Sequence, residues 1–246
     1  MNKLYKYSPE LLKGFLTVSG LRILGLFLGY LFILMVAKNF GATVLGQYQL
    51  AMHIVSTCVI FATLGFDNLT LKYSSHIRSS KYCTVSTPDI VKKWGTLVFI
   101  SAIIFTIILI LFSDLIAQTF FKSNLALKYL NLIYWVIPLH TLNLLACQLL
   151  RGVGSIHLSE FFRSVHIRIF NITIVGLCIL TDRKNDLYLY VSFVIATIFA
   201  FLIIFTLIRL NFWNIKNEQK ELSENEVEKL DLWASLRQSL PMYQSS

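Results

Sequence analysis

The amino-acid sequence predicts an all-α membrane protein that crosses the bilayer six times. Of its 246 residues, 56% are hydrophobic and 14% are charged, and the mean hydropathy is +0.65, which is far too apolar for a soluble domain of this size. Six apolar runs are each about twenty residues long, enough for a helix to cross a hydrocarbon core of roughly 30 Å. Helices are expected because a helix satisfies its own backbone hydrogen bonds in lipid.

The apolar runs divide the chain into an N-terminal segment (1–13), a six-helix transmembrane lobe (14–208) and a polar segment (209–246). The fifth run is the least apolar, because its first half contains Arg163, His166 and Arg168. The expected spans are 14–37, 44–66, 94–112, 130–150, 159–180 and 187–208.

The first span contains a single arginine, Arg22, about nine residues beyond Lys13 and therefore roughly 13 Å along the helix. Gly25 and Gly29 lie on the same side of that helix as Arg22, and small residues at this spacing let another helix approach closely. Two interpretations stay open. Arg22 reaches the membrane surface or pairs with a carboxylate such as Asp67, or it faces an internal cavity.

The fifth span has a polar stripe, because Glu160, Arg163, Ser164, Arg168 and Asn171 fall within one arc of a helical wheel. Arginines with few acidic partners inside a membrane suggest a cavity that receives an anion, and phosphate suits their bidentate geometry. The alternative is that these arginines pair structurally with Glu160 and with backbone carbonyls.

The fourth span contains Pro138, which lacks a backbone N–H and should kink or loosen the helix. The kink predicts either a moving part of a transporter or ordinary helix packing. His140 follows on the same span and is a candidate for proton coupling.

Charge sets the predicted topology. Of the 22 lysines and arginines, sixteen fall in or beside segments on the same side as the N-terminus, five fall on the other side, and Arg22 lies within the membrane. This positive-inside bias places both termini in the cytoplasm and accounts for the net charge of +9 without a nucleic-acid partner. The polar segment ends in LPMYQSS, where a seventh helix could start, so the chain is expected to be truncated or naturally shortened.

No enzyme signature is present in the sequence. It has no glycine-rich phosphate loop with its lysine, no HExxH motif and no serine elbow, so we expect neither an enzyme nor a cofactor. The four cysteines have no metal-ligand spacing, so no metal site is expected.

Several stretches resemble polysaccharide flippases of the multidrug/oligosaccharidyl-lipid/polysaccharide (MOP) superfamily. These are the Lys13–Gly14 start followed by an arginine in the first span, AKNFGATVLGQYQLA at the outer turn, CQLLRGVGSIHLSEFFRSVHIRIFNI between the fourth and fifth helices, and SLRQSLPMYQSS. The resemblance extends over essentially the whole chain and implies one lobe, the N-terminal one, of a two-lobed transporter.

The resemblance implies flipping of undecaprenyl-pyrophosphate-linked oligosaccharide across a bacterial inner membrane by alternating access, for O-antigen, lipopolysaccharide or other surface polysaccharide synthesis. Its expected partners are that lipid-linked oligosaccharide, membrane lipid and a second lobe or copy. Arg22 best fits the cationic role of holding the pyrophosphate, and the helical wheel adds Arg163 and Arg168.

Two other functions remain as alternatives. One is an antiporter of cationic drugs, which the charge sign disfavours, because such a site would favour carboxylates inside the membrane. The other is a membrane scaffold or remnant fragment that does not transport.

Overall fold

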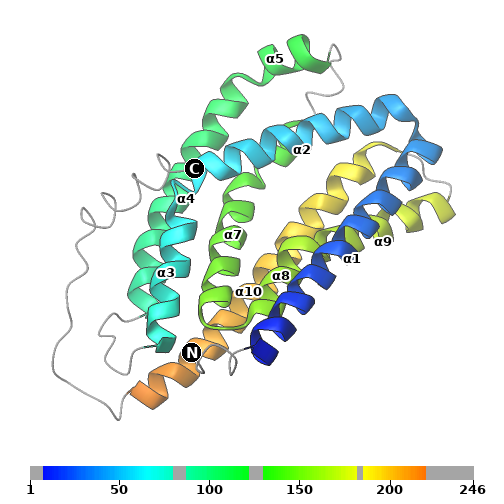
Figure 1. The fold of residues 1–246 in the computed structure, drawn as a ribbon. Helices are drawn as coiled ribbons and strands as arrows, with labels where there is room; N and C mark the ends of the chain where they lie inside the picture. The colour runs from blue at the N-terminus through cyan, green and yellow to red at the C-terminus, as the bar shows by residue number, and fades with distance from the viewer. Residues whose placement is uncertain (1–7, 80–86, 122–129, 182–184, 220–246) are drawn as a thin grey trace.

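The computed structural model describes residues 8–79, 87–121, 130–181 and 185–219, which form helices and turns without any strand among them (Figure 1). Six helical segments are long and apolar enough to cross a membrane, which confirms the all-α, six-span prediction. These segments are Gly14–Phe40, Ala42–Ala62, Lys93–Leu111, Leu130–Gly152, Ile156–Leu180 and Leu187–Arg209. The expected start of a seventh helix lies outside the described residues.

The spans alternate in direction along the chain, and several are built from more than one helix (Figure 1). The last helix extends past the expected end of the sixth span, to Gln219. The elements are α1 (Ser8–Phe40), α2 (Ala42–Ala62), α3 (Phe66–Ser79), α4 (Thr87–Leu111), α5 (Ser113–Ile116), the π-helix η2 (Ala117–Phe121), α7 (Ile137–Gly152), α8 (Ile156–Ser164), α9 (His166–Leu180) and α10 (Leu187–Gln219).

The second span ends four residues earlier than expected, at Ala62 instead of residue 66. The chain turns there because Leu64 and Gly65 have left-handed backbones, with φ of 50° and 76°. Such a turn cannot continue a right-handed helix. A separate helix, α3, begins at Phe66 and runs in a different direction from α2 (Figure 1).

Helix α3 is held by an apolar face that packs on α4 and α7. Phe66 and Leu69 are fully buried against Trp94 and Val98 of α4. The ring of Trp94 lies 5.8 Å from that of Phe66 and 5.2 Å from that of Tyr73, within the range of favourable aromatic pairs. The spacing of Phe66, Leu69 and Tyr73 at i, i+3 and i+7 is the sequence signal for this amphipathic helix.

Helices α3 and α7 meet at Gly152, where there is no room for a side chain. A Cβ atom at this position would overlap the Ser74 hydroxyl and lie 2.6 Å from its Cβ. The close approach of the two helices therefore depends on glycine at this position.

We expect Gly152→Ala to destabilise the protein by about 2 kcal/mol, because α3 must move away from α7. Thermal unfolding of the detergent-solubilised protein measures the loss. Ser74→Gly should restore part of the stability of Gly152→Ala by removing the clashing side chain. Gly46→Ala is the control, since a Cβ at Gly46 meets nothing within 4 Å. Equal stability of the two alanine variants would contradict this account of the contact.

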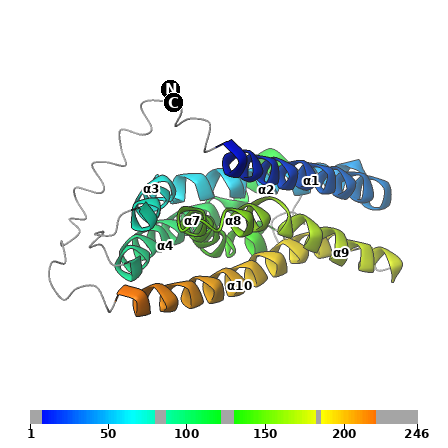
Figure 2. The same ribbon diagram turned by 60° about the horizontal axis from the view of Figure 1, so that its bottom comes forward.

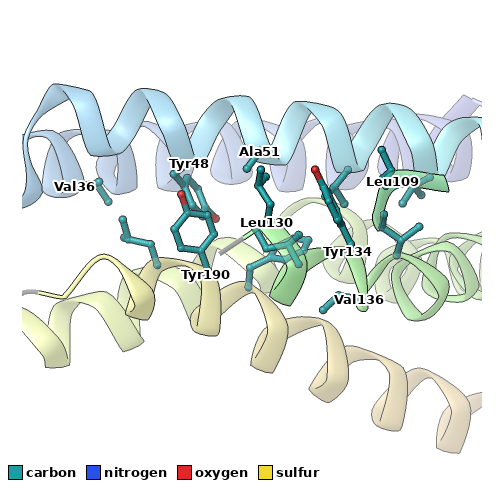
Figure 3. Packing of buried hydrophobic residues seen from close by; sticks show 14 of the residues in the cluster. Val36, Tyr48, Ala51, Leu109, Leu130, Tyr134, Val136 and Tyr190 are labelled. Carbon is teal, nitrogen blue, oxygen red and sulfur yellow. The ribbon is translucent and has the colours of Figure 1, made fainter. Parts of the chain in front are cut away.

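The largest core cluster lies where α1, α2, α9 and α10 meet residues 130–137 at the start of the fourth span, and Leu109 of α4 also belongs to it (Figure 3). Tyr48 packs edge-on against Tyr190, with ring centroids 5.6 Å apart, and Ala51 one turn along α2 is fully buried. Small residues such as Ala51 let helices pack closely, which supplies much of the association energy of helices in lipid.

The outward faces of the helices carry large apolar side chains that are exposed in the isolated chain. Leu26 is 69% exposed, Leu111 is 74% exposed and Leu180 is 84% exposed. In a soluble protein such a surface would aggregate, whereas in a bilayer lipid tails cover it at no cost. The exposed apolar surface therefore supports membrane insertion of the whole helical bundle.

Candidate binding cavity within the membrane

Arg22 of α1 forms an ion pair with Glu160 of α8. Its Nε donates to Glu160 Oε1 at 2.9 Å, and Ser164 Oγ donates to the same oxygen at 2.9 Å. The Glu160 side chain is 2% exposed and the Arg22 side chain is 55% exposed. Arg22 therefore pairs with Glu160 and not with Asp67, the carboxylate named for it from the sequence, and the pair joins the first span to the fifth.

The fifth span is broken at Val165, which separates α8 from α9. His166 follows the break and is 3% exposed, with Nδ1 2.7 Å from the Phe162 carbonyl oxygen and Nε2 2.9 Å from the Ala196 carbonyl oxygen. The imidazole therefore connects the interrupted span to α10. In a continuous helix the Phe162 carbonyl oxygen would bond only to a backbone N–H, whereas here it also lies next to the imidazole.

Arg168 of α9 packs across the small residues of α1. Its Nη1 donates to the Ser164 carbonyl at 2.6 Å. A Cβ at Gly25 would lie 2.6 Å from Arg168 Nη1 and 2.6 Å from the Ser164 oxygen, and a Cβ at Gly29 would lie 3.1 Å from Arg168 Nε. The two glycines therefore make room for the arginine side chain and for the backbone beneath it.

A cavity of about 540 Å³ is lined by residues of α1, α2, α7, α8, α9 and α10. Figure 2 shows α1 and α2 on one side of α8, and α9 and α10 on the other side. Arg163 and Arg168 both line the cavity, while Arg22 does not. Other members of its lining are Gly29, Tyr48, His140, Asn143, Cys147, His166 and Asn171.

Several polar side chains of the cavity are held by hydrogen bonds between spans. Asn171 Nδ2 donates to the Tyr48 hydroxyl at 3.2 Å, and Ser192 Oγ donates to Asn171 Oδ1 at 3.0 Å. In contrast, His140 Nδ1 and Asn143 Oδ1 are buried without a hydrogen-bond partner among the described residues. Buried polar atoms normally have hydrogen-bond partners, so we expect a polar group inside the cavity to bond to these two atoms.

The charge of this region is positive. Glu160 neutralises Arg22, and Arg168 has a carbonyl partner but no carboxylate. Arg163 is exposed, and within the described part of the chain it makes no hydrogen bond or ion pair. Arg163 and Arg168 therefore bring two positive charges to the cavity wall, whereas the one negative charge nearby, on Glu160, interacts with both Arg22 and Arg163, so the field of the cavity attracts anions.

Pro138 lies at the start of α7, directly after a turn at residues 135–136 that interrupts the fourth span. The interruption has the expected physical origin, since proline supplies no N–H for a hydrogen bond to the preceding turn and is tolerated only in the first turn of a helix. His140 follows two residues later and contacts Phe193 of α10, with ring centroids 5.5 Å apart. A hinge at Pro138 and proton coupling at His140 stay predictions.

Two parts of the site were not foreseen from the sequence. The first is the choice of Glu160 as the partner of Arg22, since a helical wheel does not show which helices are neighbours. The second is the unpartnered oxygen of Asn143. Its signal was the presence of polar residues on an otherwise apolar span, where they tend to be functional.

The fold and the cavity define a multi-pass α-helical membrane protein with a cationic chamber between its helices. A family model described as "Polysaccharide biosynthesis protein" matches residues 11–242, so the chain belongs to this family, which is that of the MOP-type polysaccharide flippases it resembles. Membership makes it a membrane protein of a polysaccharide-transport type. Searches of curated proteins and of solved structures returned no match to the chain.

Proposed function

We propose that the protein flips a polyprenyl-pyrophosphate-linked oligosaccharide, with undecaprenyl as the expected lipid, from the inner to the outer leaflet of a bacterial inner membrane. The glycan would serve O-antigen, lipopolysaccharide or another surface polysaccharide. The observation that carries the proposal is the cavity lined by Arg163 and Arg168. The family match supports the polysaccharide class of substrate.

The physical task is to move an anionic, strongly hydrated head group through hydrocarbon. A pyrophosphate loses most of its hydration there, and only paired charge and hydrogen bonds can compensate that loss. Arginine suits the role because its guanidinium stays charged and binds phosphate oxygens in a bidentate manner.

Three arginines divide this role in our proposal. Arg163 is the leading contact, since it has no structural partner in the described chain. Arg168 lies in the same cavity wall, beside Gly29. Arg22 is outside the cavity lining and is paired with Glu160 through its Nε, so in our proposal only the exposed end of its guanidinium contacts the pyrophosphate.

Alternating access supplies the movement in this proposal. The six-helix lobe rocks against a second lobe or a second copy of the chain, and no covalent step is involved. The charge bias of the loops supports cytoplasmic termini, so the head group would enter from the side on which α1 begins. Pro138 is the proposed hinge and His140 the proposed proton-coupling group.

The test is flipping by Arg163→Ala in proteoliposomes loaded with a polyprenyl pyrophosphate that carries a fluorescent sugar. We expect at least a tenfold slower transfer with unchanged accumulation and melting temperature, because Arg163 holds no other described residue. Arg163→Lys should recover only part of the rate, since lysine keeps the charge but loses the bidentate geometry.

Arg209→Ala is the matched control, because Arg209 is also exposed and does not line the cavity. Wild-type flipping by Arg163→Ala would remove the pyrophosphate assignment. A wild-type protein that does not flip the lipid, yet is required for polysaccharide synthesis in cells, would favour the scaffold. Transport of organic cations is disfavoured by the cavity, since Glu160 is already paired with Arg22.

A further inference from the structure

A second chamber adjoins the cationic cavity where α7 and α10 meet. It is a groove of about 470 Å³ between α4 and α10, with α7 as its floor and Thr70 of α3 at its edge. Its surface is almost entirely apolar, formed by residues such as Gly95, Phe99, Leu142, Leu149, Phe201 and Phe205. Phe99 and Phe205 are 40% and 56% exposed, so the groove opens toward the lipid.

The groove and the cationic cavity share part of their walls, because Asn143 of α7 and Ile204 of α10 line both. Asn143 Nδ2 donates to the Thr197 carbonyl at 3.0 Å, which fixes the orientation of the amide. Its Oδ1 is then the buried acceptor without a described partner. A donor such as water or a sugar hydroxyl is expected beside this oxygen, at the boundary between the two chambers.

The depth of the cationic cavity in the membrane distinguishes a transported lipid from an ordinary bilayer phospholipid. Arg168 packs on Gly25 and Gly29, which flank the middle of the Gly14–Phe40 span, so the cationic chamber lies near mid-membrane. The head group of a bilayer phospholipid stays at the surface, where it is hydrated. An anionic head at mid-depth with its chain in an adjoining groove is the arrangement of a lipid in transit.

We propose that this groove holds the part of the substrate's polyisoprenoid chain nearest the head group while the pyrophosphate occupies the cationic cavity. The inference rests on the proposed function, and it adds a site for the tail. Binding then depends on chain length, because each further isoprene unit that packs in the groove adds van der Waals contacts with its walls.

Gly95 gives direct access to the groove, since it lines the groove and an added Cβ would meet nothing within 4 Å. A phenylalanine at this position fills the groove without displacing the backbone. Gly176 of α9 is the matched control. It is a helical, half-buried glycine with the same open space, and it lines neither chamber.

The experiment measures binding of two probes, a long-chain polyprenyl pyrophosphate and the ten-carbon geranyl pyrophosphate, to the full chain in nanodiscs. We expect Gly95→Phe to weaken the long-chain probe about tenfold and to leave the short one unchanged, while Gly176→Phe changes neither. Phe99→Ala is a second variant, which removes an exposed wall of the groove and should weaken only the long-chain probe.

The two proposals fail in different ways. Wild-type affinity of both Gly95→Phe and Phe99→Ala for the long-chain probe would overturn the tail site and leave the pyrophosphate site standing. Failure of the wild-type protein to bind either probe would overturn the proposed function together with this inference. Equal competition by phosphatidylglycerol and the long-chain probe would assign the groove to bulk phospholipid and overturn the tail site.

Discussion

Replacing Arg22 with alanine is expected to destabilise the protein by about 3 kcal/mol, because it leaves the Glu160 carboxylate buried without its cation. Glu160→Ala should cost less, since the remaining Arg22 is more than half exposed and reaches polar surroundings. The melting temperature and the amount of folded protein in membranes measure both effects.

The double variant Arg22→Ala/Glu160→Ala separates the two roles of Arg22. Its stability should return most of the way to wild type, because no unpaired charge is left in the interface. Flipping should stay reduced, because the guanidinium proposed to contact the pyrophosphate is still missing. Recovery of both stability and flipping would show that Arg22 serves only to join α1 to α8.

Gly25→Leu is expected to prevent stable packing of α1 on the fifth span, at a cost of about 3 kcal/mol or more. The obstacle at Gly25 is the Ser164 carbonyl, a backbone atom, as well as Arg168 Nη1. The helices must separate, which weakens the Arg22–Glu160 pair that joins them. Heating the solubilised protein and following aggregation by size-exclusion chromatography measures the loss.

Variants at two other glycines of α1 show how much of the stability loss depends on close contact at Gly25. Gly20→Leu should be nearly neutral, because a Cβ at Gly20 meets nothing within 4 Å. Gly29→Ala should fall between them, since its nearest neighbour is the Arg168 side chain, which can shift. Similar stability for all three variants would show that α1 adjusts its position freely and that glycine is not required.

The number of spans was predictable because length and apolarity alone decide whether a helix can cross a bilayer. The interruptions within the spans were harder to predict. Pro138 indicated the break in the fourth span, whereas the break at Val165 contains no proline or glycine. The turn after α2 contains Gly65, a residue typical of helix ends, whereas the left-handed backbone of Leu64 has no mark in the sequence.

The cationic character of the site was predictable because arginine inside a membrane is rare and must be compensated. The arginine that pairs with Glu160 was not predictable. The polar stripe of the fifth span left pyrophosphate binding and pairing with Glu160 as alternatives, and the structure pairs Glu160 with Arg22 while leaving Arg163 in the cavity. Periodicity gives the face of a helix, and only packing gives the neighbour of that face.

The Arg22–Glu160 pair also bears on how the protein is made, since the two residues are 138 positions apart in the chain. At about 5–20 residues per second, on the order of ten seconds pass between synthesis of the arginine and synthesis of its carboxylate. During that interval the first helix holds an unpaired cation at the insertion machinery. Its apolar remainder must keep it in the bilayer until the fifth span arrives, so the order of synthesis constrains how hydrophobic this first helix has to be.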